Sequence, residues 1–270
     1  MSILRSVDAP ERRSLPGVWD GISRYLPLLS VMTFLVVWQL VSRTMNPILL
    51  PPPTAVVAGF VDLIKKGELP AAVGISLLDL FIGFAISVVG GLFIGLLMGR
   101  YRTIESLLQP YVAFFIATPS IAMVPLIIIW FGFGGPARIV VIVLGAIWPI
   151  ILNTCAGVKT TDRQLRQLAH AFSLSNRQYL GWVALPNAVP HIIAGLKLGL
   201  GQAIVSMIVA QMTMELVGLG GLVMTYGNAF KTGHLLAGIL AASLFGVVST
   251  AALDVLERKF FPWVRGRSEL

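Results

Sequence analysis

Four polar side chains interrupt long apolar runs of the sequence: Asp79, Lys197, Gln211 and Glu215. A charge among apolar residues is costly, so such groups reach toward water, pair with one another or serve the path of a polar solute. We expect Asp79 to extend outward to solvent, with a channel-facing position as the alternative, and Lys197 to reach solvent or to pair. Gln211 and Glu215 are four residues apart, on one face of a helix, and are candidates for a solute path.

A second candidate region is the proline-containing segment 118–125, which lies inside the apolar run 110–133. A proline in a helix interior removes a backbone hydrogen bond and costs about 3 kcal/mol. In lipid such a break is tolerated where the freed backbone lines a cavity within the protein. The alternative is a kinked helix that only packs. The predicted pathway residues are Thr118, Pro119, Ser120, Met123, Gln211 and Glu215.

Signatures of catalysis and of metal binding are missing from the sequence. It has no G-x-x-x-x-G-K-[S/T] loop, so hydrolysis of ATP through that device would require a separate polypeptide. The three histidines lack metal-ligand spacing, and no G-x-S-x-G nucleophile motif occurs. We therefore expect no catalytic residue, metal or cofactor in this chain, which is not an enzyme by itself.

Residues 159–191 contain a polar segment with two helix-start signals. Thr161 with Gln164, and Ser175 with Gln178, have the spacing of a capping box. Four apolar residues between them fall at i, i+3, i+4 and i+7, the pattern of one helix face: Leu165, Leu168, Ala169 and Phe172. We predict a short amphipathic helix, a turn at 172–175 and a second helix that Leu185-Pro186 ends. Such a pair can dock in a partner's groove, or it can lie on a membrane surface.

The composition shows what environment these residues occupy. Of 270 residues, 56% are hydrophobic and 12% are charged, whereas a soluble domain has about 25% charged residues. A bilayer core is crossed by about 20 apolar helical residues. The sequence therefore predicts an all-α integral membrane protein with six transmembrane helices. The predicted spans are 26–41, 75–98, 110–133, 139–158, 192–214 and 235–255.

Lys and Arg residues give the predicted orientation. Six spans put both termini on one side, and most of the 20 Lys and Arg residues fall on that side. Positive residues favour the cytoplasm, so both termini and the loop 159–191, between spans 4 and 5, are predicted to be cytoplasmic. The predicted organisation is an N-terminal tail (1–21), a membrane domain (22–258) and a C-terminal tail (259–270). The net charge of +8 flanks apolar runs and does not indicate nucleic-acid binding.

Glycines in the second span predict close helix packing. Gly91, Gly95 and Gly99 are four residues apart, and small residues at this spacing let two helix backbones approach closely in a membrane. The spacing leaves open whether the neighbouring helix belongs to this chain.

Several stretches together resemble a known family. In chain order they are 50–56 (LPPPTAV), 119–126 (PSIAMVPL), 129–134 (IWFGFG), 151–158 (ILNTCAGV), 185–186 (LP) and 195–201 (GLKLGLG). From about Leu49 to Pro262 the chain resembles the permease subunits of ATP-driven (ABC) importers fed by binding proteins, in the nitrate/sulfonate/taurine branch. Each stretch is modest alone, but their order and spacing together are specific.

The resemblance implies that the loop 159–191 is the segment that couples the permease to its ATPase. That loop typically has a Glu-Ala-Ala run, a Gly and a Leu-Pro. Here Gln167 replaces the Glu, Leu168-Ala169 the Ala pair and Ser173 the Gly, while Leu185-Pro186 is kept. The resemblance also places a Glu where this chain has Gln211. The implied ATPase-coupling residues are Arg163, Arg166, Gln167, Leu168, Ala169, Ala171, Phe172, Ser173, Leu185 and Pro186.

The implied function is alternating access for a small anionic solute, resembling sulfonate, taurine or nitrate, in the bacterial cytoplasmic (inner) membrane. The implied partners are two ATPase subunits, a second copy of this permease or a close paralogue, and an extracytoplasmic substrate-binding protein. Two alternatives stay open from the residues alone. One is a secondary carrier or channel that works without an ATPase, and the other is a membrane anchor that transports nothing.

Overall fold

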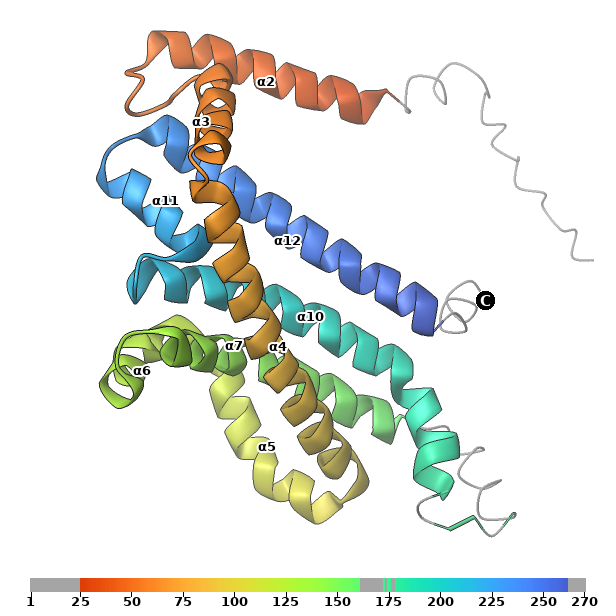
Figure 1. The fold of residues 1–270 in the computed structure, drawn as a ribbon. Helices are drawn as coiled ribbons and strands as arrows, with labels where there is room; N and C mark the ends of the chain where they lie inside the picture. The colour runs from red at the N-terminus through yellow and green to blue at the C-terminus, as the bar shows by residue number, and fades with distance from the viewer. Residues whose placement is uncertain (1–24, 161–171, 173, 176–177, 262–270) are drawn as a thin grey trace, which may run out of the picture. The chain divides into compact units, whose positions relative to one another are not determined.

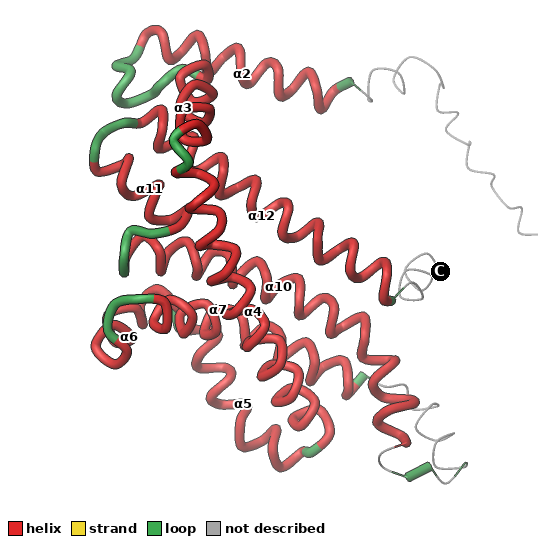
Figure 2. The backbone as a smooth tube through the Cα atoms, in the orientation of Figure 1, coloured by secondary structure: helices red, strands yellow, loops and turns green. Residues whose placement is uncertain are grey.

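The computed structural model describes residues 25–160, 172, 174–175 and 178–261, and these form helices joined by short loops, without a strand (Figures 1 and 2). This confirms the predicted all-α fold. The elements are α2 (Leu26–Thr44), α3 (Pro53–Lys65), α4 (Glu68–Arg100), α5 (Arg102–Ala117), the 3₁₀ helix η1 (Ser120–Met123), α6 (Val124–Phe131), α7 (Gly135–Lys159), the π-helix η2 (Tyr179–Ala184), α10 (Leu185–Thr213), α11 (Gly218–Asn228) and α12 (Thr232–Phe260).

Five helical segments are long and apolar enough to cross a bilayer: α2, α4, α7, Gly181–Thr213 and α12. A sixth span exists only if α5 and the segment Ser120–Phe131, bent by 94°, are counted together. The predicted span 110–133 is therefore interrupted, as its prolines indicated, and α6 ends at Phe131. Thr118 is extended, with φ −86° and ψ 120°, because the ring of the following proline disfavours the helical conformation there.

Two compact units make up the chain, residues 1–53 and 54–270. In the first unit, the indole Nε1 of Trp38 in α2 donates to the carbonyl of Pro51 at 3.1 Å. The second unit contains all of the helices from α4 onward, and the sites described below lie within it.

α7 packs between α4 and α10 in the second unit (Figure 1). A Cβ atom added at Gly91, Gly95 or Gly99 of α4 would lie 2.6–2.7 Å from side-chain atoms of Ile150, Thr154 and Val158. These three partners share the four-residue spacing of the glycines. The predicted close packing is thus confirmed, and its partner is a helix of the same chain.

The α4–α7 contact gives a stability prediction. In a Gly95→Ala variant the new Cβ would lie 2.7 Å from the Thr154 Cβ and 2.8 Å from the Ile151 carbonyl oxygen. Because the backbone oxygen cannot rotate away, we expect a loss of about 1–3 kcal/mol, measured by thermal unfolding in detergent. Gly74→Ala is the matched control in the same helix, since nothing lies within 4 Å of that position. Equal melting temperatures for the two variants would contradict the close contact.

The start of α10 corrects an expectation. Leu185-Pro186 was expected to end a helix, but residues Tyr179–Ala184 form a π-helix that continues directly into α10. Pro186 lies in the first turn of the α-helix, at the point where the π-helix changes to an α-helix. The proline therefore coincides with a change of hydrogen-bond register and does not end the helix.

Candidate functional site

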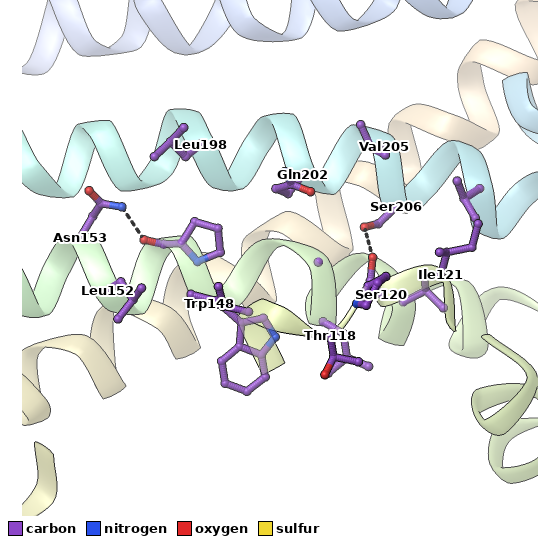
Figure 3. A pocket seen from close by; sticks show the side chains of 17 residues that line it. Thr118, Ser120, Ile121, Trp148, Leu152, Asn153, Leu198, Gln202, Val205 and Ser206 are labelled. Carbon is purple, nitrogen blue, oxygen red and sulfur yellow. Dashed lines mark hydrogen bonds between the residues drawn. The ribbon is translucent and has the colours of Figure 1, made fainter. Parts of the chain in front are cut away.

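The break between α5 and η1 places a serine against α10. The Thr118 hydroxyl donates to the Phe114 carbonyl at 2.9 Å, which satisfies a carbonyl at the end of α5. The chain then turns at Pro119 into η1, where the Ser120 Oγ lies 3.3 Å from the Ser206 Oγ of α10 (Figure 3). This contact joins the short helix after the break to α10, which is 29 residues long.

Gly145 of α7 makes room for that contact. A Cβ at this position would lie 2.0 Å from the Ser206 Oγ and 3.0 Å from the Ser206 Cβ. Ser206 is buried, so its side chain occupies the space that any other residue at 145 would fill. The glycine thus lets three elements, η1, α7 and α10, meet at one point.

A cavity of about 550 Å³ opens beside the two serines (Figure 3). This volume is typical of sites that hold a small organic molecule. None of the residues that line it carries a formal charge. They come from the end of α5, the turn 118–119, η1, α7 and α10: Ile116, Thr118, Pro119, Ser120, Ile121, Val141, Leu144, Gly145, Trp148, Pro149, Leu152, Asn153, Leu198, Gln202, Val205, Ser206 and Val209.

The polar atoms of the cavity are neutral hydrogen-bonding groups. Asn153 donates one N–H to the Pro149 carbonyl at 2.8 Å, which leaves its amide oxygen and second N–H available. Gln202 lies one turn from Ser206 on α10 and also lines the cavity. The Trp148 indole stacks on Phe115 with ring centroids 4.8 Å apart. Such a lining can hydrogen-bond a polar solute while its apolar residues contact a carbon skeleton, and it contains no fixed charge to retain an ion.

Asp79 belongs to a buried ion pair, so the expectation that it extends to solvent is wrong. It is 4% exposed, and its Oδ2 accepts a hydrogen bond from the Arg138 Nε at 2.9 Å. Arg138, in the first turn of α7, also binds the Glu215 carboxylate. The buried arginine supplies the countercharge and the donors that a carboxylate needs away from water, so Asp79 need not reach outward.

Gln211 completes this network from α10. It is fully buried; its Oε1 accepts from the Ser76 hydroxyl at 2.9 Å and from the Gly220 N–H at 3.2 Å. Its Nε2 donates to the Asp79 Oδ2 at 3.0 Å. A glutamate, the residue that the resemblance places at 211, would set a second carboxylate against Asp79 without this donor. The amide therefore suits the site, and the network joins α4, α7, α10 and α11.

The predicted pathway residues lie in three different places. Thr118, Pro119 and Ser120 line the cavity, whereas Met123 is half-buried and packs against the core around Val124 and Ile127. Gln211 and Glu215 belong to the charge network and are not among the cavity residues. Their role in a pathway stays a prediction.

Asn153, Gln202 and Ser206 were not selected from the sequence, although each is a polar residue within an apolar run. The four-residue spacing of Gln202 and Ser206, the same spacing that drew attention to Gln211 and Glu215, could have revealed them. Lys197 forms ion pairs with Asp254 at 2.7 Å and Glu257 at 2.6 Å, which confirms that it pairs and ties α10 to α12.

Part of the predicted docking loop can be described. The Ser175 N–H donates to the Gln178 Oε1 at 2.9 Å, and the Gln178 N–H donates to the Ser175 Oγ at 3.4 Å. This confirms the second capping box. Phe172 is 76% exposed, while Leu185 and Pro186 begin α10. The other predicted docking residues lie outside the described residues: Arg163, Arg166, Gln167, Leu168, Ala169, Ala171 and Ser173.

Comparison with known proteins places this geometry in context. A family model described as "Binding-protein-dependent transport system inner membrane component" matches residues 87–262. The chain is 32% identical to the putative aliphatic sulfonates transport permease protein SsuC of Bacillus subtilis (strain 168), over 87% of this chain and 86% of that one. It is 30% identical to the taurine transport system permease protein TauC of Escherichia coli (strain K12), over 97% and 98% of the two chains.

A solved structure, entitled "Crystal structure of an amino acid ABC transporter with histidines", shares the fold. It aligns with a TM-score of 0.59 and 19% identity, over 74% of this chain and 96% of that chain. The order of the helices is therefore that of a known transporter fold.

Proposed function

Because this chain belongs to the family of binding-protein-dependent transport system inner membrane components, we propose that it imports its solute together with separate subunits that hydrolyse ATP. The proposed complex contains two ATPase subunits, a second copy of this chain or a close paralogue, and an extracytoplasmic substrate-binding protein. Support comes from the family match and from the absence of a phosphate-binding loop in the sequence. Both termini are proposed to be cytoplasmic, in line with the distribution of Lys and Arg.

The observation that best supports a solute path is the neutral cavity beside the broken span. The 94° bend lies next to the contact of η1 with α10, and residues of α5, η1, α7 and α10 line the cavity. Hydroxyl and amide groups there can replace part of a solute's hydration, while the absence of charge avoids tight retention. A transport path needs both properties, since a solute must enter and also leave.

The proposed mechanism moves the broken span relative to the helices around α7. The glycine contacts make α4, α7 and α10 a closely packed group. By contrast, the hydrogen bond that joins η1 to α10 in the cavity is the 3.3 Å contact between Ser120 and Ser206. We propose that closure of the ATPases, transmitted by the loop 159–191, changes this contact and exposes the cavity to alternate sides. Such a change needs partners with different affinities for the two states.

An organic anion such as an alkanesulfonate is the proposed solute. Two relatives are named as permeases for aliphatic sulfonates and for taurine. The sulfonate oxygens would accept hydrogen bonds from Ser120, Gln202 and Asn153. The carbon chain would contact the apolar lining, which includes Leu152 and Leu198.

A Gln202→Trp variant tests this function. The larger side chain would fill the cavity from the exposed side of α10. We expect ATP-dependent uptake of a labelled alkanesulfonate into vesicles that hold the complete complex to fall to the level without ATP, while the ATPase still co-purifies. Val247→Trp is the control, because Val247 is 66% exposed and outside the cavity. Unchanged uptake by Gln202→Trp, or uptake by the chain alone without an ATPase, would contradict the proposal.

A further inference from the structure

The short helix α3 exposes two different stripes of side chains. Its 13 residues make it about 20 Å long, too short to cross roughly 30 Å of bilayer hydrocarbon. From Thr54 onward it belongs to the second unit. Three apolar side chains at i, i+4 and i+7 are 43% to 61% exposed and form its apolar stripe: Val57, Val61 and Ile64. A second exposed stripe beside it has no large apolar side chain: Thr54, Ala58 and Lys65.

The opposite side of α3 packs on the start of α12. Leu63 is fully buried. A Cβ atom added at Gly59 would lie 3.1 Å from the Gly233 carbonyl oxygen and 3.2 Å from the His234 Cα. The Asp62 Oδ2 lies 2.9 Å from the His234 Nε2. A close backbone contact and a side-chain contact therefore hold one face of α3 against the protein, while the apolar stripe on the other face stays exposed.

α3 crosses α12 and does not run along it. About 10 Å of helix separates Ala55 from Asp62. Yet a Cβ at Gly233 would lie 3.3 Å from the Ala55 carbonyl oxygen, and Asp62 meets the very next residue, His234. Both partners lie in the first turn of α12, and Figure 1 shows α3 lying across that end. Because α12 is long enough to cross a bilayer, a helix transverse to it lies close to the membrane plane.

The first turn of α12 is placed at the depth of lipid headgroups. Its 29 residues span about 44 Å, which matches the roughly 40–45 Å of a bilayer with both headgroup regions. The exposed apolar surface of α3 continues onto the neighbouring spans, at Leu77 and Leu78 of α4 and at Ile239 and Leu240 of α12. This continuity favours lipid as the neighbour of the apolar stripe.

We propose that α3 is an interfacial helix, which buries the apolar stripe in the bilayer surface at the end where α12 begins. The partner is the lipid surface itself. A helix at that boundary presents apolar side chains to the acyl chains and polar ones to headgroups and water, and the two stripes of α3 do this. Its contacts with Gly233 and His234 then tie the start of α12 to that leaflet. The inference depends on neither the solute nor the ATPase, so it can fail while the proposed transport function stands.

The test is spin labelling of the full chain in phosphatidylcholine vesicles. Consecutive residues of a helix point about 100° apart, so each stripe is sampled by a matched pair. One pair is Val57→Cys with Ala58→Cys, and the other is Ile64→Cys with Lys65→Cys. Oxygen partitions into hydrocarbon, whereas a nickel chelate stays in water. We expect the ratio of oxygen to nickel accessibility to be higher at 57 than at 58, and higher at 64 than at 65.

The reference for a lipid-facing label is Val247→Cys, at a position of α12 that is 66% exposed. The native Cys155 is buried, and the wild-type chain treated with the same label gives the background. Equal access of the nickel chelate to both members of each pair would place the apolar stripe in water and overturn the proposal. Exclusion of both reagents from 57 and 64 would show that protein covers the stripe, and would overturn it too.

Discussion

Replacing Phe172 with aspartate is expected to abolish co-purification of a phosphate-loop ATPase and, with it, ATP-dependent uptake. Phe172 is 76% exposed, and it precedes a confirmed capping box that begins the next helix. An aromatic anchor buried in a partner's groove typically contributes 2 kcal/mol or more to binding. A carboxylate there would add the cost of burying a charge. A loss of about 2 kcal/mol weakens binding about 30-fold.

A control of the same chemistry is available between α11 and α12. Phe230 is 73% exposed and lies at the other end of the helices by the order of the spans. Its φ is 53°, a left-handed conformation that aspartate tolerates better than most residues. Phe230→Asp should therefore retain the ATPase, as judged by affinity purification of the complex. If the Phe172→Asp variant and a separate Leu168→Asp variant both retained the ATPase, the docking surface would lie elsewhere.

Replacing Arg138 with methionine is expected to be the most destabilising single change within the spans. Arg138 is 8% exposed and holds both Asp79 and Glu215. Removing the cation leaves an unpaired carboxylate at Asp79, which is 4% exposed. Breaking a buried pair in this way costs about 3–5 kcal/mol. The measurement is thermal unfolding of the purified chain in detergent, and a large drop in melting temperature is expected.

Lys197→Met is the control for Arg138→Met. Lys197 also pairs with two carboxylates, Asp254 and Glu257, but its side chain is 37% exposed. Solvent can replace such a partner, so the expected loss is at most about 1 kcal/mol. A second variant, Arg138→Met with Asp79→Leu, removes the stranded charge and should recover part of the lost stability. Equal losses for Arg138→Met and Lys197→Met would show that the buried network does not hold the helices together.

Patterns local to the sequence predicted much of the fold. The apolar runs indicated the spans because a helix must present enough apolar residues to cross hydrocarbon. The glycines at 91, 95 and 99 indicated close packing because four-residue spacing puts them on one helix face. Ser175 and Gln178 indicated a helix start because a capping box is formed within four residues. Each of these features depends on neighbours in the chain.

The sequence predicted that the helix is interrupted near Pro119, but not how far the chain bends there. A proline inside an apolar run indicates an interruption, but its angle depends on what the next segment packs against. Here the segment Ser120–Phe131 is bent by 94° relative to α5. The Met123 side chain of this segment packs against the core around Val124 and Ile127. Pro186, by contrast, does not interrupt its helix, because the π-helix before it continues directly into α10. The residue type alone therefore did not distinguish a bend from a continuous helix.

The sequence by itself determined that this chain is a helical membrane protein of a binding-protein-dependent transport family, because composition, period and ordered short stretches carry that information. Only the tertiary structure decided that Arg138 is the partner of Asp79, 59 residues away, and that Gln211 donates to Asp79 across 132 residues. It also decided that Ser120 and Ser206 meet beside a neutral cavity. Such pairings are set by which helix faces come together, and no spacing along one chain specifies them.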